Sequence, residues 1–71
     1  MVVSQNALKV GAVLSNTRTG GFFSVASIGE KTEEGRIPCS LQPRPHGEAL
    51  TVEFRCRKGD MVDLFNYRVV L

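Results

Sequence analysis

The stretch LTVEFRCRKG at residues 50–59 contains the clearest candidate for chemistry in this sequence. Apolar and polar residues alternate strictly along it, so a strand here has one apolar face and one polar face with Arg55 and Arg57, followed by Lys58. Arginine and lysine bind phosphate groups, and arginine adds a planar, two-pronged geometry. The pattern indicates a face that binds a polyanion. The alternative is cross-strand pairing with nearby carboxylates such as Glu53 on a solvated surface.

The pair Phe22 and Phe23, which follows the polar loop SNTRTGG at residues 15–21, is the second candidate. Successive side chains of a strand point to opposite faces, so one ring is directed away from the core unless both faces are covered. An exposed phenylalanine near Arg18 is typical of proteins that bind single-stranded nucleic acid, because bases stack on the ring. Burial of both rings in a tight barrel or dimer is the alternative, and the sequence favours neither.

The net charge is +2, and the whole excess lies in the second half of the chain. Residues 1–35 carry three basic and three acidic side chains, so they sum to zero. Arg36 and Arg68 extend the candidate set, and Arg68 lies on a last strand that we expect to pair with residues 50–57. Such a small excess does not by itself indicate a polyanion partner, so the arrangement of the charges has to decide.

The residues predict a protein without catalytic activity. His46 is the only histidine and lies in a proline-rich loop, so no nucleophile has a positioned base. The sequence TGG at residues 19–21 lacks the lysine and the helix of a P-loop. Two cysteines and one histidine cannot complete a four-ligand zinc site, and we expect neither a metal nor a cofactor.

Both cysteines fall on the apolar phase of their segments, which favours buried, reduced thiols at Cys39 and Cys56 over a disulfide. The N-terminal segment MVVSQNALKVGAVL has no basic leader, and Lys9 interrupts its apolar run well short of membrane-spanning length. We therefore expect a cytoplasmic protein without a membrane partner.

Five segments show the alternation of half-buried strands: residues 8–14, 22–28, 36–41, 50–57 and 61–71. Pro38 removes a backbone donor, which favours a sheet edge or a bulge. Residues 57–60 predict a hairpin tip with a positive φ at Gly59. A change of phase between Leu64 and Phe65 predicts a bulge in the last strand.

Two segments are expected to lie outside the strands. Residues 29–35 are acidic and bounded by glycines, which predicts a solvated loop. Residues 42–47, QPRPHG, are expected to form turns rather than a strand, because two prolines interrupt them.

These segments predict one all-β domain over residues 1–71, a small five-stranded barrel of the OB-like or SH3-like kind. The core of a chain this short contributes only about 3 to 5 kcal/mol. Self-association is therefore expected, with a dimer favoured, and a two-layer sandwich completed by a second subunit is an alternative fold. The pattern does not contain the strand order, so both barrel topologies stay open.

The order of RTGGFFSV, a short strand with IPCSL, and PHGEALTVEFRCRKGDMVDLFNYRVV resembles the layout of the small single-stranded DNA-binding proteins of filamentous phages. The resemblance covers most of the chain and rests on spacing and on a few glycine and aromatic positions. It implies an OB-like barrel, a two-fold dimer and cooperative coating of single-stranded DNA in the host cytoplasm. It also implies that Arg18 lies in the basic loop and that Phe22 or Phe23 is the stacking aromatic.

Two functions follow from these observations. The first is non-catalytic binding of single-stranded nucleic acid, with DNA favoured, through eight residues: Arg18, Phe22, Phe23, Arg36, Arg55, Arg57, Lys58 and Arg68. The second is a small protein-binding adaptor or inhibitor on an SH3-like barrel, which grips a protein partner by a strand edge or an apolar patch.

Overall fold

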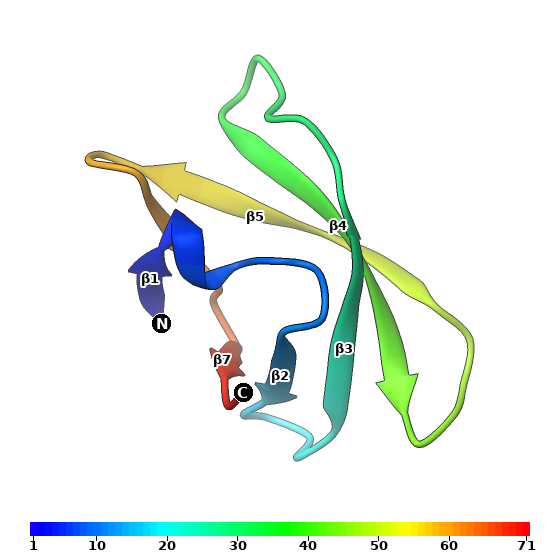
Figure 1. Ribbon diagram of the computed structural model, residues 1–71. Coiled ribbons are helices and arrows are strands. Elements are labelled where there is room, and N and C mark those ends of the chain that lie inside the picture. Colours follow the sequence, from blue (N-terminus) through cyan, green and yellow to red (C-terminus); the bar gives the residue numbers. More distant parts are fainter.

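Seven strands form one antiparallel sheet that curls into a half-barrel in the computed structural model, which describes residues 1–71 (Figure 1). The strands are β1 (Val2–Ser4), β2 (Val13–Asn16), β3 (Phe22–Ile28), β4 (Arg36–Arg44), β5 (Leu50–Arg57), β6 (Met61–Asp63) and β7 (Tyr67–Val69). A single 3-10 turn, η1 (Gln5–Ala7), follows β1. No helix of this structure has the length and apolar character needed to cross a membrane. The chain is all-β, as predicted.

The sheet curls because of the way its last two strands pair. Strands β2 to β6 are neighbours in chain order, whereas β7 pairs with β2, on the far side of the sheet from β6. Residues 64–66 are the only connection between β6 and β7. Such a short connection forces β2 and β5 to approach each other, which bends the strands between them into a half-barrel.

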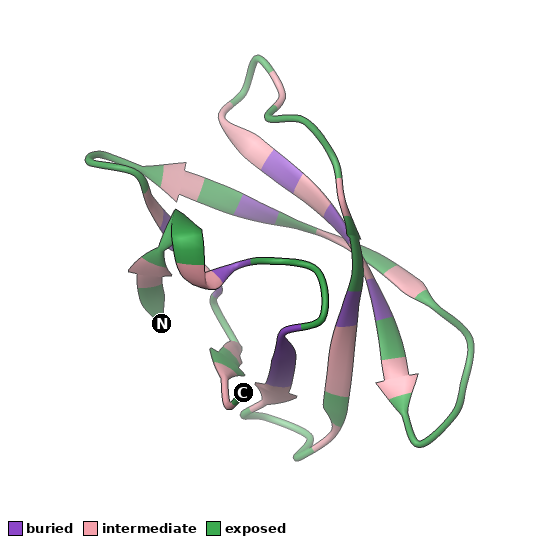
Figure 2. Cartoon of the chain, viewed as in Figure 1, coloured by how far each residue is buried: buried purple, intermediate pink, exposed green.

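Alternating residues of these strands form the core inside the curve (Figure 2). The largest fully buried side chains come from five different elements or their flanks: Phe54, Leu14, Leu41, Leu64, Val25, Val62 and Cys39. No polar or charged residue is buried. Every charged side chain therefore lies on the outer face of the sheet, at its ends or in the loops.

Two predicted strands have the predicted bounds. β3 spans Phe22–Ile28 and β5 spans Leu50–Arg57, each with its apolar phase directed inward. The predicted hairpin tip is also present, with Gly59 and Asp60 both at positive φ between β5 and β6. Residues 29–35 form the expected loop between β3 and β4.

The predicted strand at residues 8–14 is wrong for most of its length. Only Val13 and Leu14 lie in β2, and residues 8–12 form the connection from η1, with a turn that contains Gly11 at φ +92°. Leu8 and Ala12 are nevertheless buried, while Val10 is 64% exposed. The apolar residues mimic strand alternation because this loop folds back over the open end of the half-barrel.

β4 is an interior strand of the sheet, but it pairs with β3 only over Cys39–Arg44 and with β5 only over Arg36–Leu41. The Pro38 carbonyl accepts a hydrogen bond from the Gly29 amide at 2.7 Å, so its nitrogen also faces the β3 side, just beyond the last residue of β3. Pro43 is an odd number of residues away and faces β5, which begins opposite Leu41. Each missing donor thus points to a place where the neighbouring strand has ended.

This arrangement also corrects the prediction for residues 42–47. Gln42, Pro43 and Arg44 continue β4, and only the residues after them form a turn-rich connection to β5. Two prolines are tolerated in this nine-residue strand because each lies where only one neighbour is present.

The C-terminal segment contains a turn where a bulge was predicted. The turn has Phe65 at φ 52° and separates β6 from β7. A true bulge occurs instead in β3, between Val25 and Ser27. β7 pairs with β2 and not with β5, so Arg68 lies opposite Ser15, and its predicted pairing with residues 50–57 is wrong.

Candidate functional site

The eight predicted binding residues fall into two groups at opposite ends of the outer face. One group, near the start of β3, comprises Arg18, Phe22 and Arg68, with Phe23 on the inner side of the same strand. The other group lies around the start of β4 and the end of β5: Arg36, Arg55, Arg57 and Lys58. Arg36 and Arg44 are eight positions apart along β4, which corresponds to ~26 Å at about 3.3 Å per residue.

Four outer-face residues form a row across adjacent strands at the first of these ends. Arg44 of β4 lies opposite Phe22 of β3, Phe22 lies opposite Ser15 of β2, and Ser15 lies opposite Arg68 of β7. We refer to Arg44, Phe22, Ser15 and Arg68 as the Phe22 row. Register partners on neighbouring antiparallel strands have Cα atoms about 4.5 to 5.5 Å apart, so Arg44 and Phe22 lie side by side on the outer face.

A shallow hollow of about 680 Å³ opens beside this row. Its lining is mostly apolar: Val13, Phe22, Arg44, Pro45, Val70 and Leu71. Val13 faces outward but is buried, and the chain after β7 runs alongside it, with the Val70 amide donating to the Val13 carbonyl at 2.9 Å. The hollow therefore has an apolar floor, with a cation and an aromatic ring in its walls.

The two adjacent phenylalanines have different surroundings. The Phe22 side chain is 49% exposed on the outer face. Phe23 packs against the core and meets Tyr67 edge to face, with ring centroids 5.7 Å apart. Tyr67 makes a second edge-to-face contact with Phe54 at 5.8 Å. Of the two, Phe22 is the ring that offers a free surface for stacking.

Arg18 lies at the same end of the molecule, in the turn between β2 and β3. The Asn16 side chain accepts hydrogen bonds from the amides of Arg18 and Thr19, at 2.9 and 3.2 Å. Thr17 ties this turn to the β6–β7 turn, because its hydroxyl and its amide both donate to the Asn66 carbonyl. The backbone that carries Arg18 is therefore held in place next to β7.

Sequence reasoning missed Arg44. Its position has the same parity as Arg36 along β4, which would have assigned it to the outer face if residues 42–44 had been recognised as strand. No carboxylate lies within 4.0 Å of Arg44, Arg68 or Arg18, since the three ion pairs of the structure involve other residues. The cations around the Phe22 row are thus free to meet an anionic ligand.

The second basic group is partly neutralised by neighbours. Arg36 lies 3.7 Å from the Glu53 carboxylate and Arg57 lies 3.2 Å from that of Asp63. For these two arginines the cross-strand pairing alternative is correct. Arg55, which lies between Arg36 and Asp63 in the register, forms no ion pair, and neither does Lys58 in the exposed turn.

Asp63 organises this end of the sheet. Its carboxylate accepts a hydrogen bond from the Phe65 amide at 2.9 Å, and this bond is the main reason that its pKa is lowered from the usual value. The nearby Arg57 guanidinium and the N-terminal ammonium, 3.9 Å away, lower the pKa further. The charged carboxylate thus holds the β6–β7 turn and keeps Arg57 folded against the sheet.

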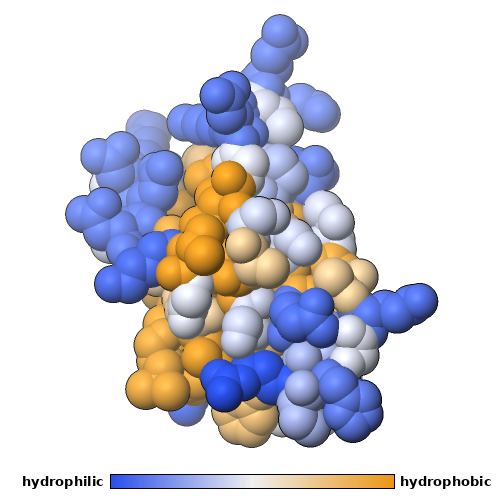
Figure 3. All heavy atoms as spheres, turned by 45° about the vertical axis from the view of Figure 1, so that its right-hand side comes forward, coloured by the Kyte–Doolittle hydropathy of each residue, from blue (hydrophilic) through white to orange (hydrophobic).

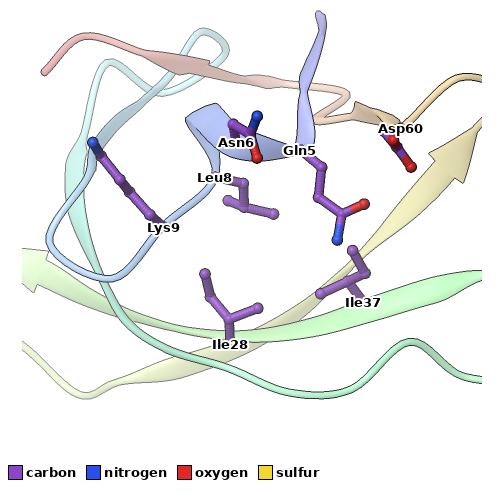
Figure 4. A pocket seen from close by; sticks show the side chains of 7 residues that line it. All are labelled: Gln5, Asn6, Leu8, Lys9, Ile28, Ile37 and Asp60. Atoms are coloured by element: carbon purple, nitrogen blue, oxygen red, sulfur yellow. The ribbon is translucent and has the colours of Figure 1, made fainter.

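Another hollow, of about 480 Å³, lies at the open end of the half-barrel (Figure 4). Ile28 and Ile37 form its floor, Gln5 projects over them from η1, and Lys9 and Asp60 lie on opposite sides (Figure 4). None of the predicted binding residues lines it. No three metal-ligating side chains meet anywhere in the structure.

Several large apolar side chains are exposed on the surface of the protein. Figure 3 shows apolar side chains gathered on one face with hydrophilic groups at its margins. The large hydrophobic residues with the most exposed surface are Met1, Val2, Val10, Phe22, Phe65 and Leu71. Among them, Phe22 alone lies in register with an arginine.

Both cysteines are free thiols. Cys39 is buried in β4, and this burial raises its pKa to about 11. Cys56 of β5 is only half-buried, so the prediction of two buried thiols holds fully for Cys39 alone.

Comparison with known proteins returned no relative: no family model, no curated protein and no solved structure matches this chain.

Proposed function

We propose that this protein is a non-catalytic binding protein for single-stranded nucleic acid and that the Phe22 row is its primary contact surface. The observation that carries the proposal is an exposed aromatic ring in register with an unpaired arginine, beside an apolar hollow. A base can stack on Phe22 while Arg44, Arg68 and Arg18 meet the neighbouring phosphates. This combination serves any sequence, because every base has a face to stack on.

The expected stacking free energy and salt dependence are those of a modest binding site. Stacking on one aromatic side chain contributes roughly 1 to 3 kcal/mol per base. Three cations that each neutralise one phosphate of a single strand predict a log–log salt slope of roughly −2, at about −0.7 per phosphate. The binding should therefore be weak in sequence preference and sensitive to salt.

The strand order bears on the type of barrel. Strands β2 to β6 follow one another as a meander, whereas an OB barrel has Greek-key connections. We therefore favour the SH3-like alternative for this fold, with the nucleic-acid site on the outer face near the start of β3. The proposal rests on the Phe22 row and does not require an OB topology or a dimer.

Fluorescence anisotropy of a labelled oligothymidylate at two salt concentrations tests the proposal. We expect Phe22→Ala to weaken binding roughly fivefold to a hundredfold, which corresponds to the loss of one stacked base. Phe65→Ala, which removes another exposed phenylalanine, should leave the affinity unchanged. Absence of binding at low salt, or equal loss in both variants, would contradict the proposal.

A second candidate function has one specific observation in its favour. Most of the hollow beside Phe22 is apolar, so it could also accept an apolar side chain of a protein partner. In that case Arg44→Gln would have little effect on binding of the partner, and oligothymidylate would not bind. The same titration therefore separates the two functions.

A further inference from the structure

The outer face of β4 connects the two basic ends of the sheet. Arg36, Ser40 and Arg44 lie on this face, because the alternate residues Ile37, Cys39 and Leu41 point into the core. Ser40 is four residues from each arginine, which places it ~13 Å from either end at about 3.3 Å per residue. A ligand that lies along β4 would therefore touch both ends and the middle.

The middle of this face is a row of hydroxyl groups. Ser40 of β4 lies opposite Ser27 of β3 and opposite Thr51 of β5 in the register. Ser27 reaches this position because of the bulge between Val25 and Ser27. Their side chains make no hydrogen bond within the protein. Serine and threonine hydroxyls commonly contact phosphate and sugar oxygens of nucleic acids. Three free hydroxyls across three strands suit that purpose.

The far end offers cations in a less favourable setting. Arg55 and Lys58 form no ion pair, whereas Glu53 lies between them and the hydroxyl row, opposite Pro38. A carboxylate at this position repels phosphate, and it also holds Arg36 at 3.7 Å. The far end should therefore act as a second, weaker contact for a strand already bound at the Phe22 row.

We propose that a single nucleic-acid strand runs along β4 from the Phe22 row, across Ser40, to Arg55. This inference rests on the proposed function and adds the path, the length and the order of contacts. The strand would stack a base at Phe22 and meet Arg55 only with phosphates ~26 Å away. At a stacked spacing of about 3.4 Å per nucleotide this distance corresponds to about eight nucleotides, and to fewer in an extended strand.

A length series of labelled oligothymidylates, from about four to about sixteen nucleotides, tests the path. The variants are Arg44→Gln at the near end, Arg55→Gln at the far end, and Lys9→Gln as the control. Lys9→Gln makes a similar loss of charge at the open end of the half-barrel, on the side of the inward-facing Ile37 and not on the outer face of β4. Circular dichroism of each variant confirms that the fold is retained.

We expect Arg44→Gln to weaken binding at every length. Arg55→Gln should leave the shortest oligonucleotide unaffected and weaken the longest roughly fivefold, the equivalent of about 1 kcal/mol for one exposed charged contact. Its salt slope on the longest should fall by about 0.7, whereas Lys9→Gln should change neither quantity.

The outcomes distinguish the path from the function. If no oligonucleotide binds at low salt, the proposed function itself is overturned. If binding occurs but Arg55→Gln weakens short and long oligonucleotides alike, or weakens neither, the path along β4 is overturned while the Phe22 site stands.

Glu53→Gln provides an independent test in the opposite direction. Removal of this carboxylate eliminates a repulsive charge on the path and frees Arg36 for a phosphate. The affinity for the longest oligonucleotide should rise about twofold to fivefold, while that for the shortest stays the same. An unchanged affinity for the longest would show that the strand does not pass this position.

Discussion

Phe22 and Phe23 show how one step along a strand changes the role of a side chain. The pleat places Phe22 outside and Phe23 inside, where Tyr67 covers its ring. The sequence predicted that the two rings differ unless both faces are covered. Which ring is inside depends on the phase of β3, and Val25 on the same face as Phe23 is part of the core.

Alanine substitutions separate the two roles. Phe23→Ala should lower the free energy of unfolding by roughly 2 to 4 kcal/mol, because it leaves a cavity against Tyr67. Phe22→Ala should change it by about 0.5 kcal/mol or less, since surface substitutions seldom do more. Chemical denaturation measures both. Equal destabilisation would show that Phe22 is also packed.

The buried thiol of Cys39 should make the folded protein less stable at alkaline pH. Burial raises the pKa of its thiol from 9.0 to about 11, so the unfolded chain releases this proton at lower pH than the folded chain. The contribution of the protonated Cys39 thiol to the free energy of unfolding is therefore complete below pH 9. It disappears as the pH rises to about 11. A shift of this size corresponds to about 2 to 3 kcal/mol.

The measurement compares the wild type with Cys39→Ala from pH 8 to pH 11 by chemical denaturation. The cavity left by alanine costs the same at every pH, so the advantage of the wild type should shrink across this interval. A constant difference would mean that the thiol titrates normally in the folded protein.

At the scale of elements, β4 shows why prolines are poor guides to strand ends. Pro38 and Pro43 both lie within the strand, each facing the side on which its neighbour has ended. The sequence identified the alternating phase of residues 36–41 correctly but could not indicate where β3 and β5 stop. Arg44 was missed for this reason, although it lies next to Phe22.

The turn between β6 and β7 depends on the charge of Asp63. The folded-state pKa of this carboxyl is lowered, chiefly by the Phe65 amide and then by Arg57. Its contribution to stability is therefore present above the unfolded pKa of 3.8 and is lost as the pH falls through the lower, folded value.

Asp63→Asn tests this role. The variant should have a lower thermal midpoint than the wild type at neutral pH, because asparagine keeps an acceptor oxygen but loses the charge that attracts Arg57 and the N-terminus. The two midpoints should converge in acid, as the wild-type carboxyl becomes protonated. A difference that persists below pH 2 would assign the effect to packing instead of charge.

At the scale of the whole molecule, closure of the sheet decides which cations act together. Because β7 joins β2, Arg68 lies two strands from Phe22 and belongs to the near end of the proposed path. Arg55 lies at the opposite end, next to Asp63. The expected pairing of the strand that carries Arg68 with residues 50–57 was wrong for this reason.

Substitution of the arginines in pairs checks the arrangement. With a short oligothymidylate, Arg44→Gln and Arg68→Gln together should reduce the log–log salt slope by about 1.4, at about 0.7 per phosphate contact. Adding Arg55→Gln should have no further effect at that length. A further loss on adding Arg55→Gln would place all three arginines around one short segment of nucleic acid.

The sequence by itself determined what depends on neighbours along the chain. Alternation at residues 22–28 and 50–57 identified two strands with their bounds and faces, because side chains of a strand alternate whatever it pairs with. The same local chemistry singled out the pair Phe22 and Phe23, without choosing between them, and the basic face of β5. Only the tertiary structure decided that Arg44 and Arg68 flank Phe22 and that Leu8 lies in a loop over the core. Pairing depends on how the whole sheet closes, and the three residues between β6 and β7 impose that closure from outside any single strand.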